Sequence, residues 1–386
     1  MSEKSAVKRE KWIQTSIKES VPHNRVKILK NGAQAFPAML EAIEGARKTI
    51  NLEFYKISSD ATGWGFAKSL VQKQMQGCEV RLIYDSIGSM DTDPELFYYM
   101  KSNGIKVLEF NPYMPFGSRQ WGWWQRDHRK MIIIDGKTGF AGGINITDEY
   151  ASAGENTGNW RDTGLLIEGP GVRDLQRLFV SSWVSRGGDM INGKQFFPHI
   201  EARGDIMVKI LDSKERKHRR IIRRAYMKAI KHAKKYICIE NAYFLPDRGI
   251  LRVLKNAKKR GVDVWLILPK ISDITAVLYA SRSLYARLLK WGVKIFEWQN
   301  TVLHSKTAVI DDIWSTVGSF NIDRISITHN LEVNVMVINE DFGRAMKAMF
   351  VEDMNYCSKI DPGEWGKRSL REKILEKLFY FIRHWL

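Results

Sequence analysis

Residues 128–135 read HRKMIIID and residues 304–311 read HSKTAVID, so one pattern of His, Lys and Asp occurs twice in the chain. Four further pairs of similar segments accompany it in the same order: VKIL at 26–29 and 208–211, INLEFY at 50–55 and ICIENAY at 237–243, GCEVRLIYD at 77–85 and GVDVWLILP at 261–269, and GIKVLEFN at 104–111 and GVKIFEWQ at 292–299. The shared order indicates an internal duplication, and two similar lobes are its simplest interpretation.

Each lobe alternates helical and strand patterns. The helical stretch at 63–77 precedes the apolar, β-branched run EVRLIY at 79–84, and the second lobe repeats this order at 247–261 and 262–268. Such alternation is typical of helices that cover a sheet. We therefore expect an α/β fold of two similar lobes, each a mixed β-sheet flanked by helices. The lobes should be related by a pseudo-twofold axis, with the active site between them.

The duplication divides the chain into five expected segments. They are a basic N-terminal extension at 1–25, a first lobe at 26–168, an inter-lobe segment at 169–207, a second lobe at 208–345, and a C-terminal segment with an amphipathic helix at 346–386. The inter-lobe segment contains Gly187, Gly188, Gly193 and Pro198, so part of it is predicted to be loop.

The 386-residue chain is globular in composition and strongly basic. Apolar residues make up 44% and charged residues 27%, and 61 Lys and Arg against 43 Asp and Glu give a formal net charge of +18. This charge suits nucleic acid, an acidic membrane or a phosphorylated substrate. The three cysteines lie far apart without a CxxC spacing, which is typical of a reducing compartment. No apolar run reaches the roughly 20 residues of a membrane span and no secretory leader occurs. We therefore expect peripheral contact with the cytoplasmic side of the cell membrane.

The spacing inside the repeated motif places its basic groups together. Side chains two residues apart in a strand share a face, so His128 projects with Lys130 and His304 with Lys306. The lysines supply positive charge for a phosphodiester. One imidazole can attack phosphorus and form a phosphohistidine, while the other protonates the departing alcohol. Such a pair should titrate together, with one ring neutral and the other cationic. Neither lobe carries both histidines, which gives the duplication a mechanistic reason.

Both copies of the motif continue with an Asp and an Asn. Asp135 and Asp311 have the opposite strand parity to the His and Lys and fall where each strand turns, so the spacing predicts a structural role for them. Ten residues after each Asp comes an Asn, Asn145 in GGIN and Asn321 in GSFN. The equal spacing predicts a hairpin that returns an amide donor beside the His and Lys, where it can bind phosphate.

An attacking imidazole must be held by its second nitrogen, usually by a carboxylate. Asp162 and Glu332 each open the strand that follows the Asn, and they are the candidate partners. Glu53 and Glu240 also repeat, but their place on the first strand of each lobe fits a structural role equally well. The six histidines outside the motifs show no metal-ligand spacing, and no Walker-type glycine loop occurs. We expect neither a metal nor another cofactor.

These residues resemble the signature of the phospholipase D superfamily, HxKxxxxD followed by G[SG]xN, which the chain carries twice between Val26 and about Glu340. More narrowly, the chain is similar to bacterial cardiolipin synthases in GGINITDEY at 142–150, WRDTGLLIEGPGV at 160–172, NAYFLP at 241–246 and VGSFNID at 317–323. The resemblance implies phosphatidyl transfer without a metal. One phosphatidylglycerol would give a phosphatidyl-histidine and free glycerol, and a second would accept the phosphatidyl group to make cardiolipin.

The resemblance also implies roles for individual residues. It assigns the catalytic set to His128, Lys130, Asp135, His304, Lys306 and Asp311. The N-terminal histidine is the usual nucleophile of the family, although the two can exchange roles. Many members carry paired transmembrane helices before the first lobe, where residues 1–25 of this chain are polar, so the chain resembles the shorter subclass. Gly164 stands where long-form members have the His of WRDTH, a difference that bears on the choice of acceptor.

Three segments predict contact with an anionic surface. Residues 203–236 carry 13 Lys or Arg and 3 acids, with apolar residues at helical spacing. Residues 369–386 predict a basic, aromatic-tipped interfacial helix. Trp121, Trp123 and Trp124 lie just before the first motif and suit the depth of lipid headgroups. The alternatives are a solvated basic face, a terminal helix docked on the core, and an aromatic lid over the site.

Three functions fit these observations. The first is a phosphatidyltransferase that makes cardiolipin at an anionic phospholipid surface, with phosphatidylglycerol as donor and acceptor. The second is a phospholipase D hydrolase or a diester nuclease, with water as acceptor or nucleic acid as substrate. The third is an inactive binding module, against which two complete His-Lys pairs argue. Aromatic, amphipathic elements favour lipid over nucleic acid. The acceptor, the nucleophilic histidine and the oligomeric state stay undetermined, and no obligatory protein partner is evident.

Overall fold

The computed structural model describes residues 3–112, 125–151, 160–213 and 220–383. Seven strands lie in the first half of the chain: β1 (Val21–Lys30), β2 (Thr49–Phe54), β3 (Glu79–Asp85), β4 (Lys106–Phe110), β5 (Lys130–Ile134), β6 (Thr138–Gly142) and β7 (Thr163–Glu168). The strands of the second half are β8 (Ile206–Asp212), β9 (Tyr236–Asn241), β10 (Asp263–Pro269), β11 (Lys294–Trp298), β12 (Lys306–Ile310), β13 (Trp314–Gly318), β14 (Val333–Ile338) and β15 (Cys357–Lys359).

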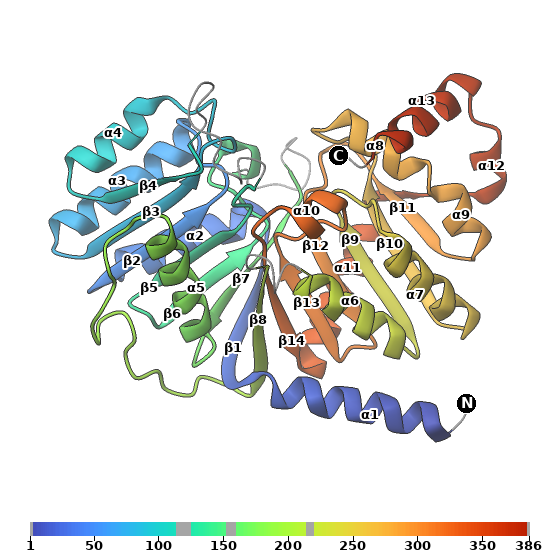
Figure 1. The fold of residues 1–386 in the computed structure, drawn as a ribbon, viewed down its shortest axis with the longest axis horizontal. Coiled ribbons are helices and arrows are strands. Elements are labelled where there is room, and N and C mark those ends of the chain that lie inside the picture. The colour runs from blue at the N-terminus through green and yellow to red at the C-terminus, as the bar shows by residue number, and fades with distance from the viewer. Residues whose placement is uncertain (1–2, 113–124, 152–159, 214–219, 384–386) are drawn as a thin grey trace.

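All of these strands belong to one hydrogen-bonded sheet, in the order β15-β11-β10-β9-β12-β13-β14-β8-β1-β7-β6-β5-β2-β3-β4. The two central strands, β8 and β1, are antiparallel. Outward from this pair the two halves repeat the same order of strands, and β15 is added at one edge. Figure 1 shows the first lobe on the left and the second on the right, with β1 and β8 between them. The expected α/β fold of two similar lobes is confirmed.

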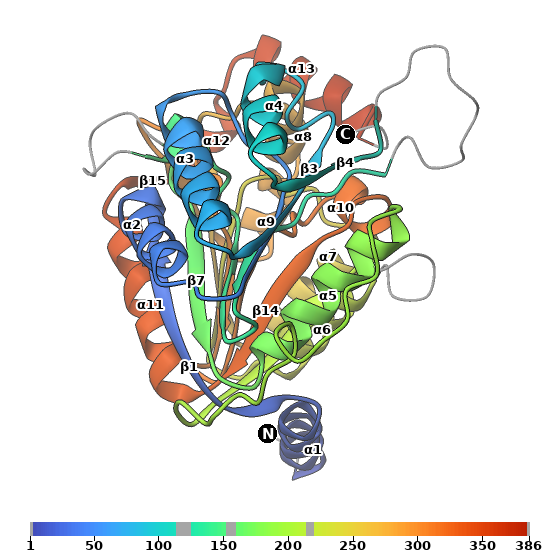
Figure 2. The same ribbon diagram turned by 90° about the vertical axis from the view of Figure 1, so that its left-hand side faces the viewer.

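Helices cover the sheet in both lobes (Figures 1 and 2). They are α1 (Glu3–Lys18), α2 (Asn31–Glu44), α3 (Ala61–Met75), α4 (Pro94–Ser102), α5 (Val172–Ser185), α6 (Ile221–His232), α7 (Arg248–Lys259), α8 (Thr275–Arg282), α9 (Tyr285–Lys290), α10 (Arg324–Thr328), α11 (Glu340–Met354), α12 (Pro362–Gly366) and α13 (Leu370–Phe381). A 3-10 turn, η1 (Asp148–Tyr150), follows β6. Among the described residues, no helix is long and apolar enough to cross a membrane.

Matching helices of the two lobes begin and end by the same chemistry. The side chains of Asp60 and Asp247 each accept a hydrogen bond of 2.9 Å from a first-turn N–H group, at the starts of α3 and α7. Both helices end just before a glycine with positive φ, Gly77 at 91° and Gly261 at 85°. A left-handed residue after the helix end favours glycine. The duplication is therefore visible in the caps as well as in the strands.

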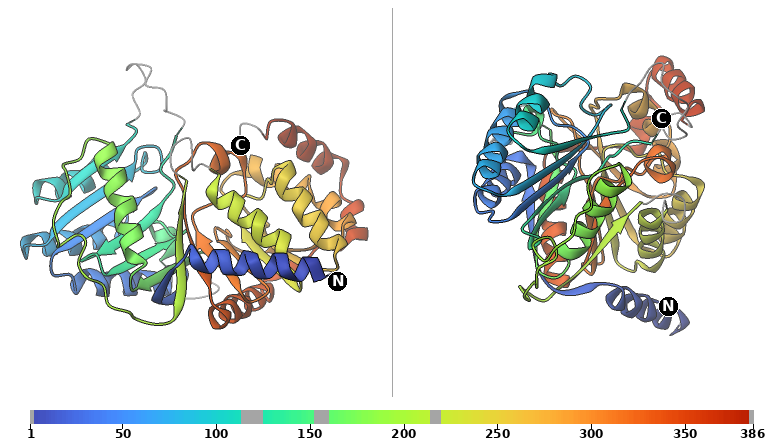
Figure 3. Two further views of the ribbon diagram at one scale, coloured as in Figure 1. Left: turned by 60° about the horizontal axis from the view of Figure 1, so that its bottom comes forward. Right: turned by 60° about the vertical axis from the view of Figure 1, so that its left-hand side comes forward.

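Segments outside the two lobes pack onto them. α1 lies across the second lobe (Figure 3), where the guanidinium of Arg9 contacts the Asp311 carboxylate at 2.9 Å and Trp12 stacks on His232. β1 begins at Val21, ahead of the expected start of the first lobe at residue 26. The expected inter-lobe segment contains α5, which packs against β5 and β6 of the first lobe.

The motif strands lie at the centre of the molecule. Met131 and Ile133, which follow Lys130 on β5, are fully buried in an apolar cluster that also takes side chains from the second lobe, among them Val309 and Val335. The shared cluster packs the two lobes together, with β6 and β7 against β13 and β14.

Candidate active site

Both motif histidines lie directly before a strand, at the junction of the lobes. His128 precedes β5 and His304 precedes β12, and their ring centroids are 6.5 Å apart. β5 runs antiparallel to β2, so His128 lies at the carboxyl end of that strand. β12 has the same relation to β9. The structure thus brings the two sequence repeats together at one place.

Backbone bridges cross between the lobes beside each histidine. Asp127, the residue before His128, bridges to Leu331 of the second lobe. Leu303, the residue before His304, bridges to Arg161 of the first lobe. Each bridge therefore pairs a motif with the start of the other lobe's carboxylate-bearing strand. The backbone alone sets which carboxylate meets which imidazole.

Each lobe supplies the carboxylate that contacts the histidine of the other lobe. Nδ1 of His128 lies 3.0 Å from Oε2 of Glu332, and Nδ1 of His304 lies 2.7 Å from Oδ2 of Asp162. An ionised carboxylate at Nδ1 holds the proton on that nitrogen and leaves the lone pair on Nε2. Each imidazole can then attack or accept a proton through Nε2. Neither lobe supplies a complete His–carboxylate pair on its own.

Burial sets the protonation of the imidazoles. His128 is 8% exposed and His304 is 4% exposed. Burial lowers the pKa of His128, against the opposing charge of Glu332. Burial, together with the positive charge of Lys306, lowers the pKa of His304 well below its ordinary value. Burial also raises the pKa of Asp162 to about 6. Without a bound anion, both rings favour the neutral state, and His304 does so more strongly.

The two motif lysines are buried beside the rings. Nζ of Lys130 donates a hydrogen bond of 2.7 Å to the carbonyl oxygen of His128, and Lys306 donates in the same way to His304. Burial lowers the pKa of Lys130 to about 7 and that of Lys306 to about 8. A bound phosphodiester anion would favour the charged form of both lysines. The pair therefore suits an anionic ligand.

The two Asn follow β6 and β13, as the hairpin spacing predicted. The side-chain amide of Asn145 donates to the hydroxyl of Tyr150 at 3.3 Å, and that hydroxyl lies 3.0 Å from Nδ1 of His304. Asn145 thus connects to the histidine of the other lobe through a tyrosine. Asn321 is buried, and its side-chain oxygen has no hydrogen-bond partner among the residues that the structure describes.

Asp135 and Asp311 lie at the far ends of the motif strands. Each occupies a tight turn with positive φ, 51° and 54°. Asp135 accepts hydrogen bonds of 2.7–2.8 Å from three successive backbone N–H groups at 47–49, and Asp311 accepts three of 2.7–2.9 Å at 234–236. A strand of five residues, about 16 Å long, separates each Asp from the histidine of its motif. These contacts favour the structural role that the spacing predicted for the two Asp over the catalytic role that the resemblance implied.

The other repeated acids neutralise buried arginines. Glu53 accepts a hydrogen bond of 3.0 Å from Arg129, and Glu240 lies 3.8 Å from Arg161. Arg161 also pairs with Asp353 at 2.6 Å. All five side chains are buried. Of the two roles left open for Glu53 and Glu240, these contacts favour the structural one.

Sequence reasoning missed the aromatic side chains around the histidines. Tyr55 lies edge-on to His128 with ring centroids 5.1 Å apart, and its ring also faces Nζ of Lys130 at 4.9 Å. Around His304 lie Trp160, Tyr150 and Tyr243, with ring centroids at 5.3, 5.8 and 6.4 Å. The sequence feature that could have identified them is their position. Tyr55 and Tyr243 follow β2 and β9, and Tyr150 and Trp160 lie beside the GGIN and RDTG segments. These rings restrict the access of water to the imidazoles.

Several predicted features cannot be placed. Trp121, Trp123, Trp124 and Trp385 lie outside the described residues, as does part of the basic segment at 203–236. Within the part of the chain that the structure describes, no cluster of three or more His, Cys, Asp or Glu side chains could hold a metal ion.

Comparison with known proteins identifies relatives over most of the chain. The family model described as "Cardiolipin synthase, PLD-like domain" matches residues 39–183 and 226–354. A cardiolipin synthase of Geobacillus thermodenitrificans is 36% identical over 354 residues, which cover 91% of this chain and 70% of the relative. Cardiolipin synthase 2 of Staphylococcus epidermidis is 34% identical over 356 residues, 92% of this chain and 72% of the relative. Among solved structures, phosphatidylserine synthase of Haemophilus influenzae shares the fold with a TM-score of 0.73 at 12% identity, covering 97% and 98% of the two chains.

Proposed function

The chain belongs to the cardiolipin synthase family with phospholipase D-like domains, and from this membership we propose that it joins two phosphatidylglycerol molecules into cardiolipin and glycerol through a phosphohistidine. The reaction would take place at the cytoplasmic surface of the cell membrane. The observation that carries the proposal is the pair of imidazoles at the lobe junction, each held at Nδ1 by a carboxylate of the other lobe.

In the first half-reaction, Nε2 of His128 attacks the phosphorus of one phosphatidylglycerol. For this step His304 is the imidazolium, which the bound phosphodiester anion stabilises. The N–P bond forms as the P–O bond to glycerol breaks, and Nε2 of His304 gives its proton to the departing glycerol oxygen. Glu332 stabilises the charge that develops on His128. Lys130 and Lys306 balance the charge of the phosphoryl oxygens. The resemblance supplies the choice of His128 as nucleophile.

In the second half-reaction, a hydroxyl of another phosphatidylglycerol is the acceptor. His304, now neutral, removes the hydroxyl proton as the oxygen attacks phosphorus and the N–P bond breaks. The products are cardiolipin and the original enzyme. Because the two half-reactions use the same groups in reverse roles, no metal is needed. The aromatic side chains around His304 support the proposal, because they hinder water from replacing the lipid hydroxyl.

The test is an incubation of the purified protein with phosphatidylglycerol vesicles, in which cardiolipin, phosphatidic acid and glycerol are measured. We expect cardiolipin and glycerol in equal amounts, and loss of both in His128→Ala and His304→Ala. His199→Ala, an exposed histidine remote from the motifs, is the matched control. Phosphatidic acid without cardiolipin would show a hydrolase instead. Cleavage of single-stranded DNA without any lipid product would show a nuclease.

A further inference from the structure

Helix α13 exposes apolar side chains on the face that points to solvent. Leu370, Ile374, Leu378 and Phe381 are 74%, 56%, 55% and 80% exposed. With about 3.6 residues per turn, these four side chains lie within roughly 80° of the helix circumference. A surface helix normally shows its polar side to water. The arrangement in α13 is the reverse, and a contiguous exposed apolar stripe marks an interaction surface.

The opposite face of α13 is firmly docked. Phe379 stacks on Tyr279 of α8 with ring centroids 5.8 Å apart. Glu376 is buried and accepts a hydrogen bond of 2.7 Å from Arg368. Ser369 caps the helix in a reciprocal arrangement with Glu372. The helix is therefore held in place by contacts of its own, and the apolar stripe is presented outward by that docking.

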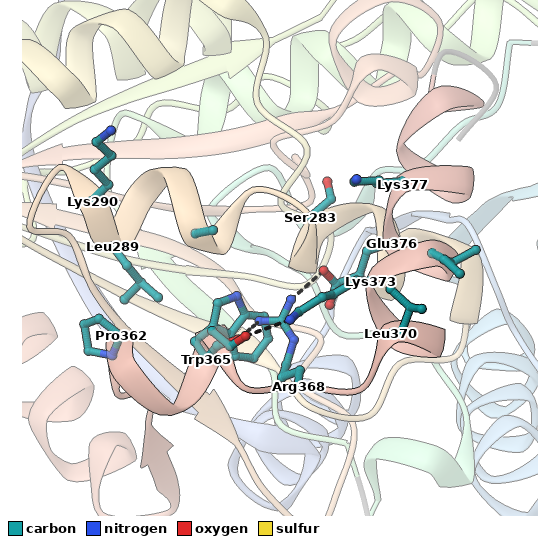
Figure 4. A pocket seen from close by; sticks show the side chains of 13 residues that line it. Ser283, Leu289, Lys290, Pro362, Trp365, Arg368, Leu370, Lys373, Glu376 and Lys377 are labelled. Atoms are coloured by element: carbon teal, nitrogen blue, oxygen red, sulfur yellow. Dashed lines mark hydrogen bonds and ion pairs between the residues drawn. The ribbon is translucent and has the colours of Figure 1, made fainter.

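A groove continues the stripe toward the body of the second lobe. Its volume is about 560 Å³, and it lies between α9, α12 and α13 (Figure 4). Leu289 and Trp365 line it together with Leu370 and Ile374 of the stripe, and Lys290 and Lys377 stand on its two sides. Neither lysine forms an ion pair with a described residue. The groove thus joins apolar walls to two available cations.

α13 lies beside α8 (Figures 1 and 2). β10, which leads into α8, runs parallel to β9, so α8 follows the same edge of the sheet at which His304 lies. α8, on which α13 packs, follows the loop after β10, where Ile271 and Ile274 are 45% and 42% exposed. In that loop Asp273 accepts a hydrogen bond of 2.5 Å from Tyr243, whose ring lies 6.4 Å from His304. α13 is therefore connected to the histidine through α8, the loop before it and Tyr243.

We propose that the α13 surface, formed by Leu370, Ile374, Leu378, Phe381, Lys290 and Lys377, docks the enzyme on an anionic phospholipid bilayer. The inference rests on the proposed function, because it gives an enzyme that uses lipid a surface that binds lipid. The stripe inserts among acyl chains, and the groove receives a lipid whose phosphate meets the two lysines. A second copy of the chain is the poorer occupant. In a symmetric dimer the two lysines of one copy would face the same two lysines of the other copy, and these like charges would repel.

The experiment is flotation of the full chain with vesicles of phosphatidylglycerol and phosphatidylcholine, and with pure phosphatidylcholine vesicles. One variant carries Leu370→Ser, Ile374→Ser, Leu378→Ser and Phe381→Ser, and a second carries Lys290→Glu and Lys377→Glu. All six side chains lie at the surface or the groove edge, so the fold should survive. The controls are Met75→Ser and Lys259→Glu, an exposed apolar and an exposed basic residue at the ends of α3 and α7.

We expect the wild-type chain to float with the anionic vesicles only. Each surface variant should bind them at least about tenfold more weakly, which is about 1.4 kcal/mol, while the controls bind as wild type. All variants should keep wild-type turnover of monomeric short-chain phosphatidylglycerol. Unchanged binding by either surface variant would overturn the proposal. So would a wild-type dimer that the serine variant dissociates. Normal vesicle binding without cardiolipin synthesis would instead reject the proposed function and leave the docking surface standing.

Discussion

The two lobes present His and Lys in the same strand register, but they surround the two histidines differently. Beside His128 lies Glu332, which accepts a hydrogen bond of 2.5 Å from Ser319. Beside His304 lies the shorter Asp162, and the position of Ser319 is taken by Gly143. A Cβ on Gly143 would come within 2.3 Å of an Asp162 oxygen. The glycine therefore makes room for the carboxylate that the serine of the other lobe supports by a hydrogen bond.

The two lobes therefore share their backbone register but differ in the side chains that surround the histidines. The shared register places both imidazoles, and the cross-lobe bridges give each a carboxylate. The divergent side chains then set unequal pKa values, with the lower one at His304 because burial and Lys306 act together there. Equivalent substitutions in the two lobes should therefore have unequal effects wherever the surroundings differ, and equal effects where the chemistry needs both copies.

The largest expected effect is the loss of either histidine. His128→Ala and His304→Ala should each lower kcat for cardiolipin formation by about 10⁵-fold or more, because removing one member of a catalytic unit costs nearly as much as removing all of it. Steady-state synthesis from phosphatidylglycerol vesicles measures this. If one variant kept a tenth of wild-type activity, the histidine of that lobe would be dispensable, and the claim that the chemistry needs both copies would be wrong.

The next effect is loss of a carboxylate. Glu332→Gln and Asp162→Asn should each lower kcat by about 10⁴-fold, because the imidazole loses the group that fixes its tautomer and balances its charge. The exchange between lobes is tested by NMR titration of the imidazoles. Glu332→Gln should lower the pKa of His128, since the carboxylate now raises it, and should leave His304 nearly unchanged. A shift confined to His304 would contradict the exchange.

A smaller effect is expected at Gly143 and Ser319, the equivalent positions beside the two carboxylates. Gly143→Ala should displace Asp162 and lower kcat by about 10²-fold, as expected for misplacement by about 1 Å. Ser319→Ala removes one hydrogen bond to a charged group and should lower kcat by about tenfold. Gly65→Ala, where an added Cβ meets nothing within 4 Å, is the control. Equal activity of the two site variants would mean that the lobes tolerate change alike.

The last expected effect is a graded dependence on pH. The phosphodiester keeps one charge throughout, so its binding weakens as each lysine loses its proton. With pKa values of about 7 for Lys130 and about 8 for Lys306, kcat/KM should fall as pH rises above 7, and more steeply above 8. The limiting slope is about one decade per pH unit for each lysine. The measurement uses monomeric short-chain phosphatidylglycerol. A constant kcat/KM between pH 7 and 9 would show that neither lysine titrates there.

Much of the fold and part of the site follow from the sequence, because they depend on local periodicity. The alternation of helix and strand patterns gave the α/β class, and strand parity separated Asp135 from His128. Spacing also selected Asp162 and Glu332 as candidate carboxylates. The sequence could not predict that each carboxylate contacts the histidine of the other lobe, because this depends on how the lobes pack. The rings of Tyr55 and Tyr150 were missed for the same reason, because aromatic side chains near a strand end fit a core equally well.

The central claim is that the two half-sites act in sequence through one covalent intermediate. The most direct measurement is rapid acid-free quenching during turnover of phosphatidylglycerol labelled in its phosphate, followed by peptide mapping. We expect a labelled phosphatidyl group on one motif histidine, His128, that appears before cardiolipin and passes into cardiolipin when unlabelled phosphatidylglycerol is added. Label on His304 would mean that His304 is the nucleophile and His128 the proton donor. Steady cardiolipin synthesis with no labelled histidine at any time would contradict the account, because transfer would then be direct from lipid to lipid.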